Sequence, residues 1–450
     1  MAEKAIKLRP RAAEHGMRIV KPCLRLEGEV VVPGDKSISH RAAILNSLAQ
    51  GEAKIDNFAP GRDCQATVKC LKALGVKIVR KGTRDVPTLL VLGKGADGLR
   101  EPSNVLNAEN SGTTMRLLGG LLASQPFLSI ITGDASLRSR PMGRLIEPLR
   151  LMGAEIWGRG RDSFAPLVIK GKKLRGIDFT MPIPSAQIKS AILIAGLFAN
   201  GETRVHQKIS SRDHTENMLK RMGVKLQSSE NSISLSPLNT PLVPLSLRVP
   251  GDISSTAYFL VAAAIHPDAR VVVRDCGVNP TRTGIIDVLL AMGARLRIEN
   301  EKVEAGEPLA DIVVESSELK GVEVGGDIIP RLIDEIPVLA VAACAARGKT
   351  IIRNAEELRV KESDRIATVV SELSRLGAKI EPLPDGMIIY GGKALTGAVV
   401  DSHLDHRLAM TLGVAGLIAK GETAIKHAQA AQVSYPGFWQ ALQQIAVGKS

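Results

Sequence analysis

The chain has 450 residues, of which 44% are hydrophobic and 23% charged, a composition typical of globular proteins and not of disordered ones. Its net charge of +13 suits either nucleic acid or small acidic substrates, but only 3% of its residues are aromatic, which argues against a protein that stacks rings on single-stranded bases. A chain of this length is too long to fold around one hydrophobic core of ordinary size, so we expect two domains.

The N-terminal residues are basic, include acidic residues and lack an apolar core. We therefore expect no secretory signal, and instead a frayed basic extension over residues 1–24. The sequence has no run of 18 apolar residues, so we expect no membrane span. Its five cysteines are scattered and form no metal-type pairs, which favours a reducing compartment such as the cytoplasm.

Residues 32–41 combine the end of a strand, a Pro-Gly turn and the start of a helix. Asp35 is a plausible N-cap, which puts Lys36, Ser37 and Arg41 near free backbone N–H groups and the positive end of the helix dipole. This arrangement predicts a phosphate or carboxylate site. The alternative is a capped helix with solvated charges.

One eight-residue sequence pattern recurs along the chain at intervals of roughly 70–85 residues. Each copy combines the end of a helix, a glycine at the position after the cap, and the start of a strand. The copies are residues 71–78, 149–156, 219–226, 289–296 and 373–380, with a worn sixth copy at 442–448. The period predicts a small packed unit that is repeated six times, with strand, helix, strand, helix, strand and perhaps one strand more.

Several predicted helices are apolar all round, namely residues 190–198, 259–265, 338–346 and 412–418. A helix without a polar face is buried on all sides. We therefore expect an α/β fold with helices inside and sheets outside.

The Pro-Gly turn at residues 32–35 has a second copy about halfway along the chain, because the sequence Val-Pro-Gly-Asp occurs again at residues 249–252. Three units lie between the two turns and three follow the second. We expect one three-unit domain over residues 34–248, and a second, discontinuous one over residues 25–33 plus 249–450. The turns would be the crossings between them, and the strand before the first turn would pack with the second domain.

Polar groups concentrate at six further places, residues 110–116, 138–142, 184–190, 333–339, 358–365 and 403–407. Taken singly, each can be explained by helix capping or by solvated ion pairs. The pair His403 and His406 has no third ligand with matching spacing, so we expect no metal. Gly348-Lys349-Thr350 lacks the earlier glycine of a phosphate-binding loop and belongs to the repeat.

Taken together, these motifs occur in the order found in the EPSP synthase (3-phosphoshikimate 1-carboxyvinyltransferase) family, and the chain from about residue 25 onward resembles its mostly bacterial branch. The resemblance implies two domains of three βαβαββ units each, an inside-out α/β barrel known as the enolpyruvyl transferase fold. It implies transfer of the enolpyruvyl group of phosphoenolpyruvate to the 5-hydroxyl of shikimate 3-phosphate, in the pathway towards chorismate and the aromatic amino acids.

The resemblance also carries over two sets of contacts. Shikimate 3-phosphate would contact Lys36, Ser37, Arg41, Ser185, Ala186, Gln187, Arg212, Asp334 and Lys361. Phosphoenolpyruvate would contact Lys36, Gly112, Arg140, Gln187, Arg365 and Arg407.

For the chemistry, an addition followed by an elimination, the resemblance implies Glu362 as proton donor and Asp334 as acceptor of the hydroxyl proton. Lys36 would assist proton transfer or phosphate departure. It implies no cofactor, because phosphoenolpyruvate is already activated. We expect a cytoplasmic monomer whose partners are these two small molecules, with no nucleic acid and no membrane.

Some positions depart from one branch of the family, which has Ser at Ala186 and Tyr at Arg212. That branch also has a Lys before the C-terminal aromatic-Pro pair, whereas Val433 and Ser434 precede Tyr435 here, so a phosphate contact from this segment is in doubt. Gly112 keeps a glycine that some glyphosate-insensitive members replace with Ala, which favours sensitivity.

Two alternatives stay open from the sequence. The sister enzyme UDP-N-acetylglucosamine enolpyruvyl transferase has the same fold but a Cys acid on the loop that corresponds to residues 136–142, where this chain has none. A basic nucleic-acid binding module is disfavoured by the few aromatic residues and the dispersed charge.

Overall fold

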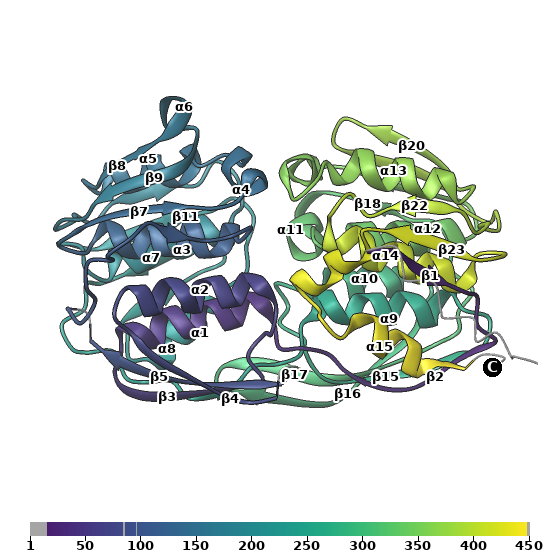
Figure 1. Ribbon diagram of the computed structural model, residues 1–450, viewed down its shortest axis with the longest axis horizontal. Coiled ribbons are helices and arrows are strands. Elements are labelled where there is room, and N and C mark those ends of the chain that lie inside the picture. The colour runs from purple at the N-terminus through teal and green to yellow at the C-terminus, as the bar shows by residue number, and fades with distance from the viewer. Residues whose placement is uncertain (1–15, 84–85, 96, 448–450) are drawn as a thin grey trace, which may run out of the picture.

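The structure is a computed structural model and describes residues 16–83, 86–95 and 97–447. Figure 1 shows two lobes side by side, the first mostly from the purple to teal part of the chain and the second mostly from the green to yellow part, which the purple strands β1 (Arg18–Val20) and β2 (Arg25–Val31) join. In both lobes, sheets enclose a group of helices. This arrangement agrees with the predicted fold.

The sheets of the first lobe share one strand order. In the middle unit, β6 pairs in parallel with β7, β7 pairs antiparallel with β9, and β9 pairs antiparallel with β8. The other two sheets have the orders β14-β3-β5-β4 and β10-β11-β13-β12.

The elements of the first lobe follow the predicted alternation of strands and helices. They are α1 (Lys36–Leu48), β3 (Gln50–Asp56), α2 (Arg62–Ala73), β4 (Lys77–Gly82), β5 (Pro87–Lys94), β6 (Leu106–Asn107), α3 (Gly112–Ala123), β7 (Leu128–Thr132), α4 (Ala135–Ser139), α5 (Gly143–Leu151), β8 (Glu155–Gly158), α6 (Arg159–Asp162), β9 (Phe164–Lys170), β10 (Asp178–Thr180), α7 (Ala186–Gly196), β11 (Thr203–His206), α8 (His214–Arg221), β12 (Leu226–Ser228), β13 (Ser232–Leu235) and β14 (Leu247–Arg248).

The second lobe repeats this order in two sheets, β16-β17-β15-β2-β24 and β18-β19-β21-β20, and has a shorter third sheet, β1-β23-β22. Its elements are β1 (Arg18–Val20), β2 (Arg25–Val31), α9 (Ile253–Ile265), β15 (Ala269–Gly277), α10 (Gly284–Ala291), β16 (Arg295–Glu304), β17 (Glu307–Glu315), β18 (Glu323–Val324), η1 (Gly326–Ile328), α11 (Ile329–Leu332), α12 (Ile336–Ala345), β19 (Lys349–Ile352), η2 (Glu356–Val360), α13 (Arg365–Arg375), β20 (Lys379–Leu383), β21 (Gly386–Tyr390), β22 (Val399–Asp401), α14 (His406–Ile418), β23 (Thr423–Lys426), η3 (Ala428–Val433), α15 (Phe438–Ile445) and β24 (Ala446–Val447).

The recurring glycine marks the end of a helix in five units. Gly75, Gly153, Gly223, Gly293 and Gly377 all have φ between 87° and 95°, the left-handed conformation that a residue with a Cβ adopts at a cost. In each case the next residue donates its N–H to a carbonyl of the preceding helix, five positions back. The predicted role of this glycine is confirmed.

The two Pro-Gly-Asp turns lie side by side where the chain crosses between the lobes. Asp35 donates its N–H to the Pro250 carbonyl at 2.8 Å, and Asp252 donates its N–H to the Pro33 carbonyl at 2.9 Å. Each strand stays with the lobe that the chain leaves at the following turn, since β2 pairs with β15 of the second lobe and β14 pairs with β3 of the first lobe. The predicted packing of the first strand with the second lobe is confirmed.

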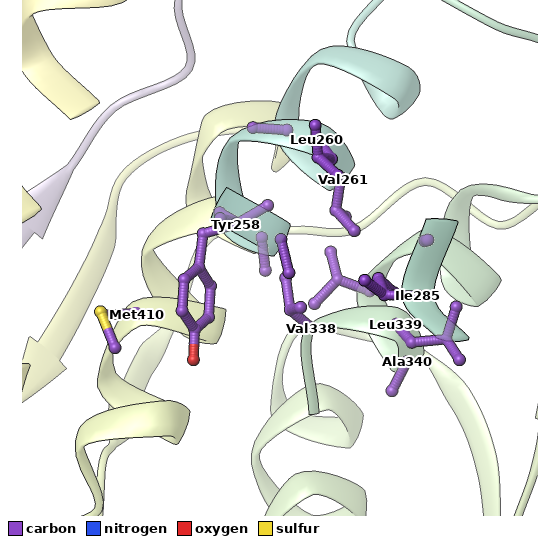
Figure 2. Packing of buried hydrophobic residues seen from close by; sticks show 14 of the residues in the cluster. Tyr258, Leu260, Val261, Ile285, Val338, Leu339, Ala340 and Met410 are labelled. Atoms are coloured by element: carbon purple, nitrogen blue, oxygen red, sulfur yellow. The ribbon is translucent and has the colours of Figure 1, made fainter. Parts of the chain in front are cut away.

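Each lobe has its own hydrophobic core. One core contains buried residues between 38 and 249, and the other contains buried residues from 20 to 32 and from 253 to 445. Helices α7, α9, α12 and α14 are buried along nearly their whole length, as their apolar sequences predict. Figure 2 shows α9 and α12 meeting in the second core around Tyr258, Val261 and Val338. We propose domain boundaries at residues 34–248 and at 25–33 plus 249–450.

Two predictions about the chain ends need correction. Residues 18–20 form β1 and pair antiparallel with β23, so the frayed extension over residues 1–24 is wrong there, while residues 1–15 lie outside the described residues. The worn copy at 442–448 does not complete the sixth sheet, because β24 pairs with β2 in another sheet. The N-terminal β1 takes up the free edge of β23 instead, since an edge strand offers unpaired backbone groups. Within the described residues, each helix is too short or too polar to cross a membrane.

Candidate active site

The predicted site residues gather at the N-terminal ends of six helices, three from each lobe. In the first lobe they are α1 with Lys36 and Ser37, α3 with Gly112, and α7 with residues 185–187; in the second they are α12 just after Asp334, α13 with Arg365, and α14 with Arg407. Free N–H groups and the positive ends of helix dipoles favour anions at such ends. The repeat thus produces one anion-binding arrangement from each lobe.

Lys36 is held by a carboxylate that the sequence did not single out. Its Nζ lies 3.0 Å from Oδ2 of Asp63, near the start of α2. Burial lowers the pKa of Lys36, but the charges of Asp63, Glu362 and Asp334 together outweigh it and the pKa is raised. Lys36 is therefore a cation in this structure. Asp35 caps α1 by accepting the Ile38 N–H at 2.8 Å, which aims the first turn at the cleft.

Arg41 is 2% exposed and ties three helices of the first lobe together. Its Nε donates to Oγ1 of Thr215 at 2.7 Å, and its Nη2 donates to Oγ of Ser190 at 2.8 Å and to the Ala186 carbonyl at 3.3 Å. Its Nη1 donates to the Ser37 carbonyl at 3.0 Å. Burial lowers the pKa of Arg41 to about 10, so it stays charged at neutral pH.

Gly112 lies against an arginine that supports Gln187. A Cβ on Gly112 would come within 2.7 Å of Nη1 of Arg116. That same Nη1 donates to Oε1 of Gln187 at 2.7 Å, and Nε2 of Gln187 donates to Oγ1 of Thr113 at 3.0 Å. The side chain of Gln187 is thus fixed by α3, which explains a residue that helix capping alone does not require.

Arg140 comes from the loop after α4 and is nearly buried. Its Nη2 donates to Oδ1 of Asn110 at 2.5 Å, and its Nη1 lies 3.6 Å from Oε1 of Glu362 in the other lobe. Its Nε has no hydrogen-bond partner within the described part of the chain. Arg140 is thus fixed in place by Asn110 and Glu362, and its Nε can still donate a hydrogen bond to a ligand.

Glu362 lies among arginines from both lobes. Its Oε2 accepts from Nη2 of Arg365 at 2.6 Å, and Arg365 is itself 1% exposed and bonded through Nε to Oδ2 of Asp405 at 2.8 Å. Burial raises the pKa of Glu362, but Arg365 and Arg140 outweigh it and hold that pKa well below its ordinary value. In this structure Glu362 is therefore ionised.

Asp334 joins the lobes through Arg212. Its Oδ2 accepts from Nη2 of Arg212 at 2.6 Å, while Nη1 of Arg212 donates to Oγ of Ser37 at 3.3 Å. Its Oδ1 lies 3.6 Å from Nη1 of Arg365. Burial raises the pKa of Asp334, but Arg212 and other cations outweigh it and hold that pKa well below its ordinary value, so the carboxylate is ionised. The pKa of Lys361 is lowered by burial, and the charge of Asp334 reverses only part of that decrease.

Two neighbours at the start of α14 complete the second lobe's share of the site. Arg407 is buried, and its backbone N–H donates to Oδ1 of Asp405, the N-cap of the helix, at 2.8 Å. Burial lowers the pKa of Arg407, but nearby acidic groups outweigh it and the pKa is raised well above its ordinary value. Burial lowers the pKa of His406 to about 4, so this ring is neutral, and its Nε2 has no partner among the residues described.

The structure brings predicted residues of both lobes together where the lobes face each other, joined by the ion pairs Arg212–Asp334 and Arg140–Glu362. The sequence reasoning missed Asp63, Arg116, Asp405 and His406 as parts of the site. Arg116, Asp405 and His406 stand inside quoted motifs, and their charge or ring was the available signal; nothing in the sequence around Asp63 pointed to Lys36. Over the described residues, no cluster of three or more His, Cys, Asp or Glu side chains could hold a metal ion.

Comparison with known proteins gives one consistent result. A family model described as EPSP synthase (3-phosphoshikimate 1-carboxyvinyltransferase) matches residues 20–442. A 3-phosphoshikimate 1-carboxyvinyltransferase from Herpetosiphon aurantiacus is 55% identical over 94% of this chain and 97% of its own, and one from Bacillus cereus is 52% identical over the same shares. The solved EPSP synthase from Acinetobacter baumannii superposes with a TM-score of 0.84 at 42% identity, covering 96% of this chain and 98% of its own. This chain belongs to the EPSP synthase (3-phosphoshikimate 1-carboxyvinyltransferase) family.

Proposed function

We propose that this protein transfers the enolpyruvyl group of phosphoenolpyruvate to the 5-hydroxyl of shikimate 3-phosphate and releases phosphate. The observation that carries the proposal is the cluster of ion pairs in which cations from both lobes converge around the ionised carboxylates of Asp334 and Glu362. Both substrates are anions with phosphate and carboxylate groups, which arginine binds with paired N–H donors. The family relation selects this pair of substrates.

The two substrates divide the cleft between them. Shikimate 3-phosphate binds on the first lobe's helix ends and on Asp334 and Lys361, through the nine residues that the resemblance names. Phosphoenolpyruvate binds between Arg140 of the first lobe and Arg365 and Arg407 of the second, with Lys36, Gly112 and Gln187 beside it. Nε of Arg140, Nη1 of Arg365 and Nε of Arg407 have no hydrogen-bond acceptor among the described residues, which supports this division because buried N–H groups are normally hydrogen-bonded.

The addition step needs one base and one acid. Asp334 is ionised and accepts the proton of the 5-hydroxyl as its oxygen bonds to the central carbon of phosphoenolpyruvate. Glu362 gives a proton to the methylene carbon, which becomes a methyl group. In the elimination step, the C–O bond to phosphate breaks, a methyl proton returns to Glu362 and the double bond is restored. Lys36 stabilises the leaving phosphate. The hydroxyl proton held by Asp334 passes to the released phosphate, so both carboxylates regain their starting states.

Glu362 must first gain its proton, since Arg365 and Arg140 keep it ionised in this structure. The phosphate and carboxylate of phosphoenolpyruvate compete for these two arginines. When they pair with the substrate, the remaining burial raises the pKa of Glu362. Substrate binding thus converts the carboxylate to the acid that the addition step requires.

The protein acts as a monomer in the cytoplasm, with small-molecule partners and no nucleic acid. One chain supplies both halves of the cleft, which supports the monomer, and five free cysteines suit a reducing compartment. Elution volume in size-exclusion chromatography at micromolar concentration tests the monomer, and a dimer-sized peak contradicts it.

The decisive experiment measures phosphate release from phosphoenolpyruvate and shikimate 3-phosphate, each alone and together. We expect release only with both. Release with UDP-N-acetylglucosamine instead keeps the fold and replaces the acceptor. No release with either acceptor, combined with salt-dependent binding of DNA, revives the nucleic-acid alternative.

A further inference from the structure

A buried ion pair lies behind the proposed substrate residues of the first lobe and takes no part in the proposed chemistry. Lys189 on α7 is 1% exposed and Glu216 on α8 is 3% exposed, and Nζ of the first lies 2.6 Å from Oε1 of the second. Removing two charges from water costs several kcal/mol per ion, which attraction repays only in a fixed geometry. A pair of this kind is a weak source of stability, so its position in the fold is informative.

On one side, the pair fixes the segment that carries Arg212. Nζ of Lys189 donates a second hydrogen bond to the Ser211 carbonyl at 3.0 Å, one residue before Arg212. Oγ of Ser211 donates to Oε1 of Gln207 at 2.9 Å, which ties together the two ends of residues 207–211 before α8. Arg212 then reaches across the cleft to Asp334. The ammonium group of Lys189 therefore holds the peptide group that joins Ser211 to Arg212, and so fixes the backbone from which the Arg212 side chain extends.

On the other side, the pair supports Arg41. Ser190 and Thr215, the residues next to Lys189 and Glu216 in the sequence, both accept hydrogen bonds from Arg41. Burial lowers the pKa of Arg41, and Glu216 is the carboxylate that most strongly favours its charged form. Oε2 of Glu216 has no hydrogen-bond partner among the described residues. One buried carboxylate thus balances two cations.

We propose that Lys189 and Glu216 are positioning residues for shikimate 3-phosphate, which fix Arg212 and Arg41 and thereby set the affinity for that substrate and not for phosphoenolpyruvate. The inference rests on the proposed function, because it assigns Arg212 and Arg41 to one of its two substrates. It adds two residues that touch neither substrate.

The test compares Lys189→Met with the unmodified protein in steady-state kinetics and in calorimetric titration with shikimate 3-phosphate. Loss of a charged hydrogen bond to the Arg212 segment predicts a KM and a Kd for shikimate 3-phosphate raised about tenfold, with the KM for phosphoenolpyruvate changed less than about twofold. An equal rise in both KM values overturns the proposal, because a loosened lobe would affect both substrates. Glu216→Asp keeps the charge and withdraws the carboxylate, and we expect a smaller rise, about threefold, from a variant that keeps the fold.

A double-mutant cycle separates positioning from general damage. In the Arg212→Ala background, Lys189→Met should raise the KM for shikimate 3-phosphate by a smaller factor than it does alone, since part of its target is gone. Full multiplication of the two factors contradicts the proposal. Asp311→Asn is the matched control, because this nearly buried carboxylate on β17 accepts hydrogen bonds from Arg274 and Asn300 away from the cleft, and its loss should leave the ratio of the two KM values unchanged.

The two proposals fail in different ways. If the unmodified protein binds shikimate 3-phosphate without releasing phosphate, the proposed function fails, and the Kd of Lys189→Met still decides the inference. If the unmodified protein turns over both substrates and Lys189→Met leaves the KM and Kd for shikimate 3-phosphate unchanged, the inference alone is wrong. Absence of any shikimate 3-phosphate binding overturns both.

Discussion

Replacing Glu362 with Gln tests whether this side chain is the proton donor. The substitution keeps the size of the group and its capacity to bond Arg365, but removes the acid. Positioned general acids contribute about 10²- to 10⁴-fold to rates, so we expect kcat to fall by that factor. The fold should hold, because Arg365 keeps Asp405 at 2.8 Å and Arg140 keeps Asn110 at 2.5 Å.

The effect on substrate affinity follows from the same ion pairs and has the opposite sign. Oε1 of Glu362 lies 3.6 Å from Nη1 of Arg140, an attraction of about 5 kcal/mol at an effective dielectric constant of about 20 before desolvation is counted. The pair with Arg140 is too long for a hydrogen bond, whereas the charged hydrogen bond from Nη2 of Arg365 to Oε2 of Glu362 at 2.6 Å has a net value of about 1.5–3 kcal/mol. Gln competes less with phosphoenolpyruvate for the arginines, so the KM for phosphoenolpyruvate should stay constant or fall, by up to about tenfold.

The assay is the initial rate of phosphate release over a matrix of both substrate concentrations. Glu357→Gln is the control, because Glu357 lies in the same segment and pairs with Arg144 across the lobes at 2.6 Å but is partly exposed. Its kcat should change less than about threefold, as expected of an exposed pair. A raised KM with an unchanged kcat in Glu362→Gln would show that Glu362 binds substrate and does not donate the proton.

Three further outcomes test the packing and charge of the site. Gly112→Ala puts a methyl group against Nη1 of Arg116, so the KM for phosphoenolpyruvate should rise about tenfold; an unchanged KM would show that Arg116 moves aside freely. Gly120→Ala makes the added methyl overlap a backbone carbonyl of α7, so urea unfolding should show a loss of about 2–3 kcal/mol, and an unaltered midpoint contradicts the close packing of α3 and α7. Burial and the nearby charge of Asp35 raise the pKa of Asp252 to about 6 from 3.8, so the wild type loses stability as the pH rises from about 4 to 6. Asp252→Asn does not titrate and should gain about 3 kcal/mol relative to the wild type over that window in urea unfolding; parallel stability curves would show that this carboxyl is ionised throughout.

Local signals in the sequence were sufficient for the repeated unit. A glycine such as Gly75 after a helix demands a left-handed backbone, and an all-apolar helix such as α12 has nowhere to lie but inside. The matching turns at Pro33 and Pro250 marked where the chain crosses between the lobes, and so predicted that β2 pairs with the second lobe. These features depend on neighbours in the chain, which is why residue patterns predict them.

Pairings between distant residues were out of reach. The strands β1 and β24 have three and two residues, too few for a period, and only the free edges of β23 and β2 decide where they pair. The contact of Lys36 with Asp63 depends on how α1 and α2 pack, and Asp63 stands in no motif. The resemblance named the side chains that face the substrates, but it gave no account of the residues that hold them.

Those holding residues explain how so many cations share one cleft. Asp63 faces Lys36, Asp334 faces Arg212, Glu362 faces Arg140, and Asp405 faces Arg365. Each of these four cations therefore has a carboxylate, without which their mutual repulsion and desolvation would oppose closure of the lobes. Two of these carboxylates, Asp334 and Glu362, are also the proposed base and acid. In the proposed mechanism, substrate anions displace these carboxylates from their arginines, so that the exchange of ion pairs releases each group for proton transfer when both substrates are in place.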